Sequence, residues 1–378
     1  MSRSSAQASL RDLVTAGRLP GITVAVARHG EVEFIDSIGY LDVEHEVALK
    51  PDSILRIYSM TKPVIATAVM QLVEEGALTL QDPVARWIPG FAHLRVMEDD
   101  ANPTLGTVPP AREVSIRHLL THTSGISYGF QQAPGVCEDS YRTAGLVGPT
   151  FALTYPLDDL VDRICGLPLA FQPGMGWRYG LNFDVLGHLL EIISGQRLDT
   201  YLTERILQPL GMTDTGFSVP ASERSRFGPL YAVTEGVGLN VVDPVQNSPW
   251  TRPDVVLSGG AGLVSTAIDY LRFALMVRGG GQLDGVRILR QSTIAEMTTN
   301  QLSGPEMPVR WEGVPDPALG HGYGFGVSVT EPHRFGWIGI NGGQVWIYPT
   351  QDVVVLAIAQ TFMDFSASDA FIAAVAPN

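Results

Sequence analysis

The sequence predicts an α/β fold of the α+β kind: one antiparallel sheet built from both chain ends and flanked by helices, plus an inserted, mostly helical domain. Short apolar runs typical of strands occur near the N-terminus and again near the C-terminus. The middle of the chain instead has the periodicity of amphipathic helices. We therefore expect residues 1–75 and 260–378 to form the sheet domain and residues 76–259 to form the helical domain.

The N-terminal part of the sheet is expected to be a β-hairpin that follows a short helix. The helix is predicted over residues 10–17, and the hairpin strands over 22–28 and 31–36, joined by a His-Gly turn. A polar connection then leads to a second helix, which is expected to end at Gly76, because glycine favours helix C-termini.

The remaining elements follow the same two patterns. Helices are expected over 114–122, 158–165, 183–194, 198–207 and 268–277. The C-terminal strands are expected over 323–329, 334–340, 345–348 and 353–360, followed by a closing helix over 369–375. Residues 217–262 are rich in Pro and Gly and lack periodicity, so we predict a long ordered loop there.

The composition is that of an ordinary globular protein with an acidic surface. Apolar residues make up 45% of the chain and charged residues 17%, and the net charge is −14. This charge argues against nucleic acid and anionic membranes as partners, and it is compatible with small neutral substrates. The N-terminus lacks the apolar core of a signal peptide, and no later stretch is long enough to span a bilayer, so we expect a cytoplasmic protein.

The tetrapeptide Ser59-Met60-Thr61-Lys62 places a nucleophile beside a base. Pro63 fits only in the first turn of a helix, where its missing N–H is no loss, so Ser59 is predicted to lie at a helix start. Residues three apart share a helix face, and therefore the Lys62 amine can lie beside the Ser59 hydroxyl, near the free N–H groups of the first turn. This arrangement is typical of an activated serine nucleophile.

The use of lysine at position 62 favours this interpretation. Of the 25 lysines and arginines in the chain, only Lys50 and Lys62 are lysines. Arginine keeps its proton in proteins, whereas a buried lysine with a lowered pKa can act as a base. The alternative is that Lys62 is an ordinary surface residue in a chain biased toward arginine, so the choice depends on other segments.

Two other segments could complete a site. Tyr179 lies on a turn ahead of a helix, where its phenol could act as a phenolate or proton relay beside Lys62, or simply be half-buried and hydrogen-bonded. The glycine-rich strand edge around Gly339 would let a substrate lie against the backbone, with the N–H of Ile340 joining that of Ser59 as an oxyanion hole. A structural role for these glycines is equally compatible with the pattern.

Taken together, these segments resemble the serine β-lactamase and penicillin-binding protein superfamily, most closely its esterase branch, the family VIII carboxylesterases. The resemblance covers nearly the whole chain through the segments 59–62, 117–125, 179–187, 207–212 and the strand at Trp337. It implies a β-lactamase/transpeptidase-like fold and a carboxylesterase that cleaves small esters without a cofactor. The implied catalytic groups are the nucleophile Ser59, the base system of Lys62 and Tyr179, and the backbone N–H groups of Ser59 and Ile340. The residues expected to line the substrate pocket are Trp337, Ile338, Gly339 and Tyr128.

The sequence departs from the superfamily pattern in ways that favour esters over β-lactams. A Lys-Thr-Gly usually holds the β-lactam carboxylate, but this chain has no lysine after Lys62. The esterase branch often has Trp-Gly-Gly at the strand edge, whereas here Ile338 follows Trp337 and is expected to narrow the pocket. The usual Tyr-Xaa-Asn is also absent, because Asn182 comes one place late.

Several alternatives remain open at the level of sequence. A β-lactamase, a D-amino-acid amidase or peptidase, and an acyltransferase would all use the same acyl-enzyme. A non-catalytic binding protein of the same fold is disfavoured, because a binder has no need for the Ser59, Lys62 and Tyr179 set. Labelling by a serine-directed phosphonate would separate a binder from an enzyme.

Other polar residues are interpreted as structural. Ser127 lies in a Gly-Xaa-Ser-Xaa-Gly sequence, but a nucleophile elbow must follow a buried strand, and this one follows an amphipathic helix. Cys137 and Cys165 are expected to be reduced thiols, and the histidines lack metal-ligand spacing, so no metal site is expected. His321 and His333 are close in sequence to the strand at Trp337 and are candidates for lining the pocket.

Overall fold

The computed structural model describes residues 3–102, 104–130, 135–234, 236–311 and 314–377. Within them, an eight-stranded antiparallel sheet has the order β15-β16-β17-β18-β19-β1-β2-β3. Its strands are β1 (Gly21–Arg28), β2 (Glu31–Asp42), β3 (Val47–Ala48), β15 (Leu319–His321), β16 (Gly326–Ser328), β17 (Phe335–Gly339), β18 (Gly343–Tyr348) and β19 (Val353–Ala359). The predicted fold class is therefore confirmed.

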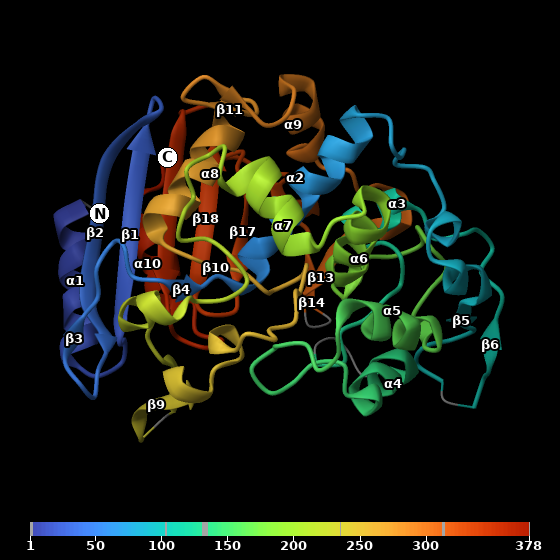
Figure 1. The fold of residues 1–378 in the computed structure, drawn as a ribbon, viewed down its shortest axis with the longest axis horizontal. Helices are drawn as coiled ribbons and strands as arrows, with labels where there is room; N and C mark the ends of the chain where they lie inside the picture. Colours follow the sequence, from blue (N-terminus) through green and yellow to red (C-terminus); the bar gives the residue numbers. More distant parts are fainter. Residues whose placement is uncertain (1–2, 103, 131–134, 235, 312–313, 378) are drawn as a thin grey trace.

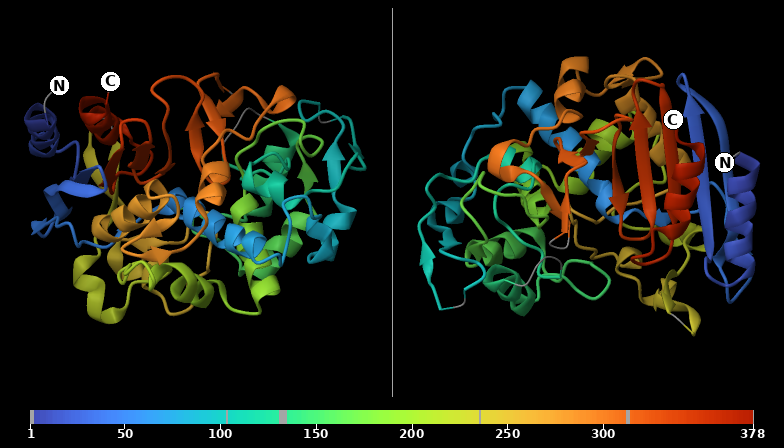
Figure 2. Two further views of the ribbon diagram at one scale, coloured as in Figure 1. Left: turned by 90° about the horizontal axis from the view of Figure 1, so that it is seen from above. Right: turned by 180° about the vertical axis from the view of Figure 1, so that it is seen from behind.

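The two ends of the chain meet at the centre of this sheet. Strand β19 pairs with β1, so that Ile22 lies opposite Ala359 and Arg28 opposite Val353. Figure 2 shows the N- and C-terminal helices beside each other, as expected if both ends contribute to one sheet. The predicted region 323–329 forms only the short strand β16, because Gly324 has a φ of 81° and interrupts the extended backbone.

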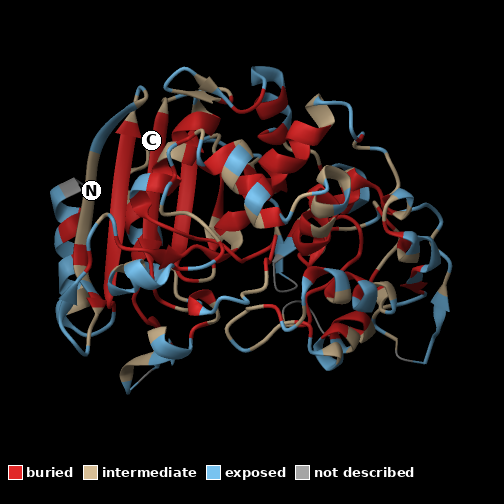
Figure 3. Ribbon diagram, viewed as in Figure 1, coloured by how far each residue is buried: buried red, intermediate tan, exposed pale blue. Residues whose placement is uncertain are grey.

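Helices cover both faces of the central strands, which are coloured as buried in Figure 3. These helices are α1 (Arg3–Thr15), α8 (Ala267–Arg278) and α10 (Ser366–Val375). Val24 and Val26 of β1 pack in the cluster with α1 and α10, whereas Ala25 and Ala27 belong to the larger core on the opposite face. This two-sided burial explains why β1 is apolar throughout rather than alternating.

The helix predicted after Ser59 is present and runs through the middle of the molecule (Figure 1). A short 3₁₀ turn, η1 (Tyr58–Met60), leads directly into α2 (Thr61–Glu74). Residues 61–72 of α2 are all buried, since the helix lies between the sheet and the helical part of the chain. The helix ends just before Gly76, whose φ is 72°, as the sequence predicted.

The middle of the chain is mainly helical. Its helices are α3 (Ile116–Leu120), α4 (Val136–Ala144), α5 (Leu157–Cys165), α6 (Asn182–Ser194) and α7 (Leu198–Leu202), the last continued by the π-helical turn η4 (Thr203–Leu207). Helix α4 was not predicted, because only a few of its residues are apolar. A small sheet joins β5 (Arg95–Met97), β6 (Thr107–Val108) and β7 (Pro168–Leu169). The proposed domain boundaries near residues 75 and 260 stay a prediction.

The prediction of a long ordered loop over 217–262 is wrong in part, because the segment contains regular elements. The segment contains the hairpin of β8 (Leu230–Thr234) and β9 (Gly238–Asp243), and three 3₁₀ turns, η5 (Ala221–Arg226), η6 (Val245–Asn247) and η7 (Pro249–Thr251). The hairpin forms because Gly236 and Gly238 both adopt positive φ angles at its turn. Its Asp243 forms a buried ion pair of 2.6 Å with Arg56 of β4 (Leu55–Arg56), three residues before Ser59.

The remaining elements are short and lie mainly before the C-terminal strands. They are η2 (Val84–Arg86), η3 (Pro89–His93), β10 (Val264–Ser265), β11 (Gln282–Leu283), β12 (Val286–Arg287), α9 (Gln291–Met297), η8 (Gly304–Glu306), β13 (Val309–Trp311) and β14 (Val314–Asp316). Among the described residues, no helix has both the length and the apolar character needed to cross a membrane.

Candidate active site

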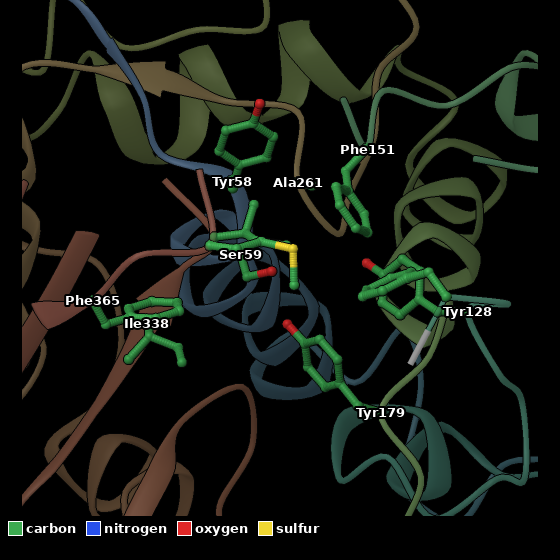
Figure 4. Close-up of a pocket in the computed structure, with 11 residues that line it drawn as sticks. Tyr58, Ser59, Tyr128, Phe151, Tyr179, Ala261, Ile338 and Phe365 are labelled. Carbon is green, nitrogen blue, oxygen red and sulfur yellow. The ribbon is translucent and has the colours of Figure 1, made fainter. Parts of the chain in front are cut away.

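A pocket of about 260 Å³ opens over Ser59 (Figure 4). Aromatic and aliphatic side chains make up most of its wall, and none of the described residues that line it is charged. The lining residues are Tyr58, Ser59, Tyr128, Phe130, Phe151, Tyr179, Ala261, Ile338, Ile340, Met363 and Phe365. In Figure 4 the hydroxyls of Ser59, Tyr128 and Tyr179 point toward the same central space. The pocket therefore suits an uncharged, apolar ligand held close to a serine hydroxyl.

Ser59 and Lys62 are in direct contact, as the sequence predicted. The Lys62 Nζ donates to Ser59 Oγ at 3.0 Å, to the carbonyl oxygen of Gly260 at 2.7 Å and to the hydroxyl of Tyr128 at 3.3 Å. Only 1% of Lys62 is exposed. Three acceptors thus fix the amine against the serine and leave it little freedom to rotate away.

Burial changes the acid–base character of this amine. The loss of solvent lowers the pKa of Lys62 to about 7, against the opposing effect of the nearby Asp184 carboxylate. An amine with a pKa near 7 is partly neutral at physiological pH and can accept a proton. Arginine could not do so at this position, which agrees with the choice of lysine in an arginine-rich chain.

Tyr179 lines the pocket beside Ser59 and Lys62. Its hydroxyl accepts a hydrogen bond of 3.3 Å from the indole N–H of Trp337 and is also hydrogen-bonded to Ser59. Its ring centroid is 4.5 Å from Lys62 Nζ. Burial raises the pKa of Tyr179, an effect that these hydrogen bonds only partly offset. The phenol is therefore expected to keep its proton near neutral pH.

The end of β17 borders the pocket on the side of the sheet. Ile338 and Ile340 line the pocket, whereas Trp337 is buried and supports Tyr179 from behind. Gly339 approaches the backbone just before Ser59 so closely that a Cβ atom would lie 2.5 Å from the carbonyl oxygen of Ile57. The strand edge and the serine turn are thus adjacent, and the oxyanion hole formed by Ser59 and Ile340 stays a prediction.

The residue before the nucleophile is strained. Tyr58 is fully buried and has a φ of 44°, a conformation that residues with a Cβ rarely adopt. Its ring packs against Trp250, with a centroid distance of 5.3 Å. Packing therefore holds the serine turn in a conformation that the isolated chain would avoid, as at many functional sites.

Sequence reasoning placed Tyr128 only in the pocket wall and missed its contact with Lys62. The residue lies next to Ser127 in the Gly-Xaa-Ser-Xaa-Gly sequence, and no local pattern indicates that its hydroxyl reaches a lysine 66 positions earlier. Burial raises the pKa of Tyr128 well above its usual value, so this phenol also stays neutral. Asp184 lies within the segment 179–187, but no sequence pattern indicates a role for it near Lys62.

Other candidate residues lie outside the pocket. Ser127 is fully buried and donates a hydrogen bond to Glu138, so it has a structural position. Asn182 bonds to Ser124 and His122 rather than pointing at Ser59. His321 is buried behind Trp337, with a ring distance of 5.1 Å.

His333 does not line the pocket, and its Nδ1 lies 3.1 Å from the Ser328 carbonyl oxygen. Cys137 and Cys165 are free thiols. Across the described ranges, no group of three or more His, Cys, Asp or Glu side chains is arranged to hold a metal ion.

The chain is similar to known proteins over nearly its whole length. The family profile described as Beta-lactamase matches residues 6–376. An uncharacterized protein of Mycobacterium tuberculosis is 36% identical over 100% of this chain and 94% of its own length. Esterase EstB of Burkholderia gladioli is 35% identical over 69% of this chain and 66% of its own length.

A solved structure supports the same relationship over the full length. The structure of EstCE1, described as a hydrolase with promiscuous acyltransferase activity, superimposes with a TM-score of 0.81 and 26% sequence identity. The match covers 99% of this chain and 98% of that one. With a serine and a lysine in contact at the start of a central helix, and a family profile that spans almost every residue, the chain belongs to the beta-lactamase family.

Proposed function

We propose that this protein is a carboxylesterase that hydrolyses small, uncharged esters through an acyl-enzyme on Ser59. The observation that carries this proposal is the contact between the Ser59 hydroxyl and a buried amine whose pKa is about 7, beneath an apolar pocket. A neutral amine beside a serine supplies the base that the nucleophile needs. A pocket wall without charged residues favours a substrate that is neutral on both sides of the ester bond.

Acylation would begin with proton transfer from Ser59 to Lys62. As the proton moves to the amine, the Ser59 oxygen forms a bond to the ester carbonyl carbon, and negative charge develops on the carbonyl oxygen. The backbone N–H groups of Ser59 and Ile340 would hold this oxyanion at the junction of η1 and β17. The close approach of Gly339 to Ile57 supports this step, because it keeps the strand edge next to the serine turn.

Release of the alcohol requires a proton donor, and Tyr179 is suited to this role. Its phenol is buried, neutral and hydrogen-bonded to Ser59. When the bond between the carbonyl carbon and the alcohol oxygen breaks, the alcohol would take the Tyr179 proton, which the Lys62 ammonium replaces. Water would then lose a proton to the same pair and attack the acyl carbon. The acid would leave as the bond from the acyl carbon to the Ser59 oxygen breaks and that oxygen takes the proton back. No cofactor takes part in this sequence.

The relatives favour ester hydrolysis over β-lactam hydrolysis. One relative is described as an esterase and a similar structure as a hydrolase with acyltransferase activity. None of the described residues that line the pocket is a cation that could hold a β-lactam carboxylate, and the chain has no lysine after Lys62. We therefore expect turnover of aryl esters to exceed that of a cephalosporin or a D-amino acid amide.

The proposal is tested by replacing two serines in parallel. Ser59→Ala should lower kcat for a short-chain aryl ester by roughly a thousandfold or more, because it removes the attacking oxygen. Ser127→Ala is the matched control and should retain activity, since Ser127 bonds to Glu138 outside the pocket. A serine-directed phosphonate should label Ser59 by mass spectrometry. Wild-type turnover by Ser59→Ala would rule out the proposed nucleophile.

A further inference from the structure

A buried carboxylate lies next to the Ser59–Lys62 pair without lining the pocket. Asp184 is in the first turn of α6 and is fully buried. Its Oδ1 accepts a hydrogen bond of 2.6 Å from the Ser258 hydroxyl and one of 3.0 Å from the backbone N–H of Gly260. The Ser258 hydroxyl also accepts a hydrogen bond of 3.0 Å from the N–H of Ala261. One carboxylate oxygen therefore holds the turn formed by residues 258–261.

This turn carries an acceptor for the Lys62 amine. The carbonyl oxygen of Gly260 lies 2.7 Å from Lys62 Nζ, the shortest of the three hydrogen bonds that the amine makes. Asp184 binds the N–H of that same glycine. A shift of Asp184 would thus move the Gly260 carbonyl and, with it, the position of the amine relative to Ser59.

The second carboxylate oxygen suggests a role for the charge itself. Asp184 Oδ2 is buried and has no hydrogen-bond partner among the described residues. A Cβ atom on Gly260 would lie 2.6 Å from this oxygen and 2.9 Å from the Tyr128 hydroxyl oxygen, so both border the same small space next to Lys62. A neutral asparagine could supply the same Oδ1 acceptor to the turn. The loop alone therefore does not require a negative charge at this position.

Four other titratable side chains surround the amine. The rings of Tyr128 and Tyr179 lie against Lys62, and burial raises the pKa of both, so they stay neutral. Burial lowers the pKa of His122 and lowers that of His321 to about 4, so both are neutral near pH 7. Within the described residues, this leaves Asp184 as the nearby group able to oppose the effect of burial on the amine. Burial raises the pKa of Asp184 itself, and the hydrogen bond from Ser258, the charge of Lys62 and the N–H of Gly260 oppose that rise by favouring the carboxylate.

We propose that Asp184 is a positioning residue for Lys62, which fixes the Gly260 carbonyl against the amine and, through its negative charge, sets the pH at which the amine becomes neutral. The expected effect of Asp184 on catalysis rests on the proposed ester hydrolysis, because Lys62 acts as the base in that reaction. Without the charge, the amine would lose its proton at lower pH. Without the hydrogen bonds, the amine would be less well placed to take the proton of Ser59.

The lysine content of the chain allows a direct test. Because Lys50 and Lys62 are the only lysines, protein labelled with ¹³C at the lysine ε-carbon gives two NMR signals, and Lys50→Arg assigns them. In Asp184→Asn, we expect the titration midpoint of Lys62 to fall by about one pH unit, because a neutral side chain no longer favours the ammonium form. The acid limb of kcat/KM for an aryl ester should move in the same direction. Asp184→Ser provides a second neutral variant if the first does not fold.

A charge-retaining variant separates electrostatics from packing. Ser258→Ala keeps the carboxylate and removes one of its two donors, so we expect a lower kcat with an unchanged Lys62 midpoint. Near-UV circular dichroism reports whether each variant is folded, and the exposed Lys50 serves as the internal reference signal. A folded Asp184→Asn with the wild-type Lys62 midpoint would overturn the inference. Absence of ester turnover in the wild type, together with a shifted midpoint in Asp184→Asn, would instead reject the proposed function and retain the effect of Asp184 on Lys62.

Discussion

Gly339 and Ile57 approach each other so closely that a single methyl group could not fit between them. A Cβ atom at position 339 would lie 2.5 Å from the Ile57 carbonyl oxygen and 2.5 Å from the Asn341 side-chain oxygen. Gly339 ends β17, and Ile57 immediately precedes the η1 turn that carries Ser59. The distance between the strand edge and the nucleophile therefore depends on the absence of a side chain at position 339.

Gly339→Ala should lower catalysis by opening this junction. The added methyl group has to push β17 away from η1. The N–H groups of Ile340 and Ser59 could then no longer both donate hydrogen bonds to the oxyanion. Loss of one oxyanion donor typically costs roughly a hundredfold or more in kcat. Steady-state kinetics with a short-chain aryl ester measures the effect. Gly106→Ala is the control, because a Cβ atom there has nothing within 4 Å, and its kcat should match the wild type.

Asp243→Asn should destabilise the fold strongly. Arg56 is fully buried and forms its ion pair with Asp243, so removal of the carboxylate charge leaves an uncompensated buried guanidinium. Breaking a buried pair in this way typically costs about 3–5 kcal/mol. Urea unfolding monitored by tryptophan fluorescence measures the change.

The control for this variant is an exposed ion pair between the same two residue types. Asp159→Asn removes the partner of Arg163 at the surface, where water screens the interaction, and we expect no measurable change in stability. Equal stabilities of the two variants would contradict a structural role for the Arg56–Asp243 pair. Asp243 is in β9 and Arg56 is in β4, which precedes Ser59. The comparison therefore also tests whether the β8–β9 hairpin, which the sequence did not indicate, stabilises the position of β4.

The sequence predicted the part of the site that depends on local geometry. Ser59 and Lys62 are three residues apart at a helix start, so helix geometry alone brings their side chains together. Tyr179 and the β17 edge could be placed only through the family resemblance, because their contact with Ser59 depends on long-range packing. The contacts of Lys62 with Tyr128 and Gly260 come from segments 66 and 198 residues away and left no local pattern.

In the fold, too, the elements set by local sequence patterns were predicted and those that depend on long-range contacts were missed. Strands β1, β18 and β19 are buried on both faces, and their continuous apolar runs made them easy to predict. The early start of α1 was missed, because its first turns contain few apolar residues and are held partly by the hydrogen bond between Gln7 and Asp36 of β2. Tertiary contacts of this kind cannot be read from periodicity.

Ile338→Gly should change which esters are accepted. Ile338 lines the pocket from the strand edge, and its removal would enlarge the space beside Ser59. We expect the ratio of kcat/KM for a long-chain to a short-chain aryl ester to rise by roughly tenfold or more, since a single methylene group in an apolar pocket already changes kcat/KM by about that factor. Val314→Ala, at an exposed position outside the pocket, should leave the ratio unchanged. An unchanged ratio in Ile338→Gly would place the acyl chain elsewhere in the pocket.

The pH dependence of the wild-type enzyme should reflect the titration of Lys62. Burial lowers the pKa of Lys62 to about 7, and only the neutral amine can accept the Ser59 proton. The value of kcat/KM should therefore fall tenfold per pH unit below about pH 7, rise through pH 7, and level off above it. Lys62→Arg should lower kcat by roughly a thousandfold at every pH, because the guanidinium keeps its proton and cannot act as a base. Lys50→Arg replaces the only other lysine and is the control: it should keep the wild-type kcat and the fall of kcat/KM below pH 7. If Lys62→Arg kept the wild-type kcat and the same fall of kcat/KM at low pH, the base would be another group.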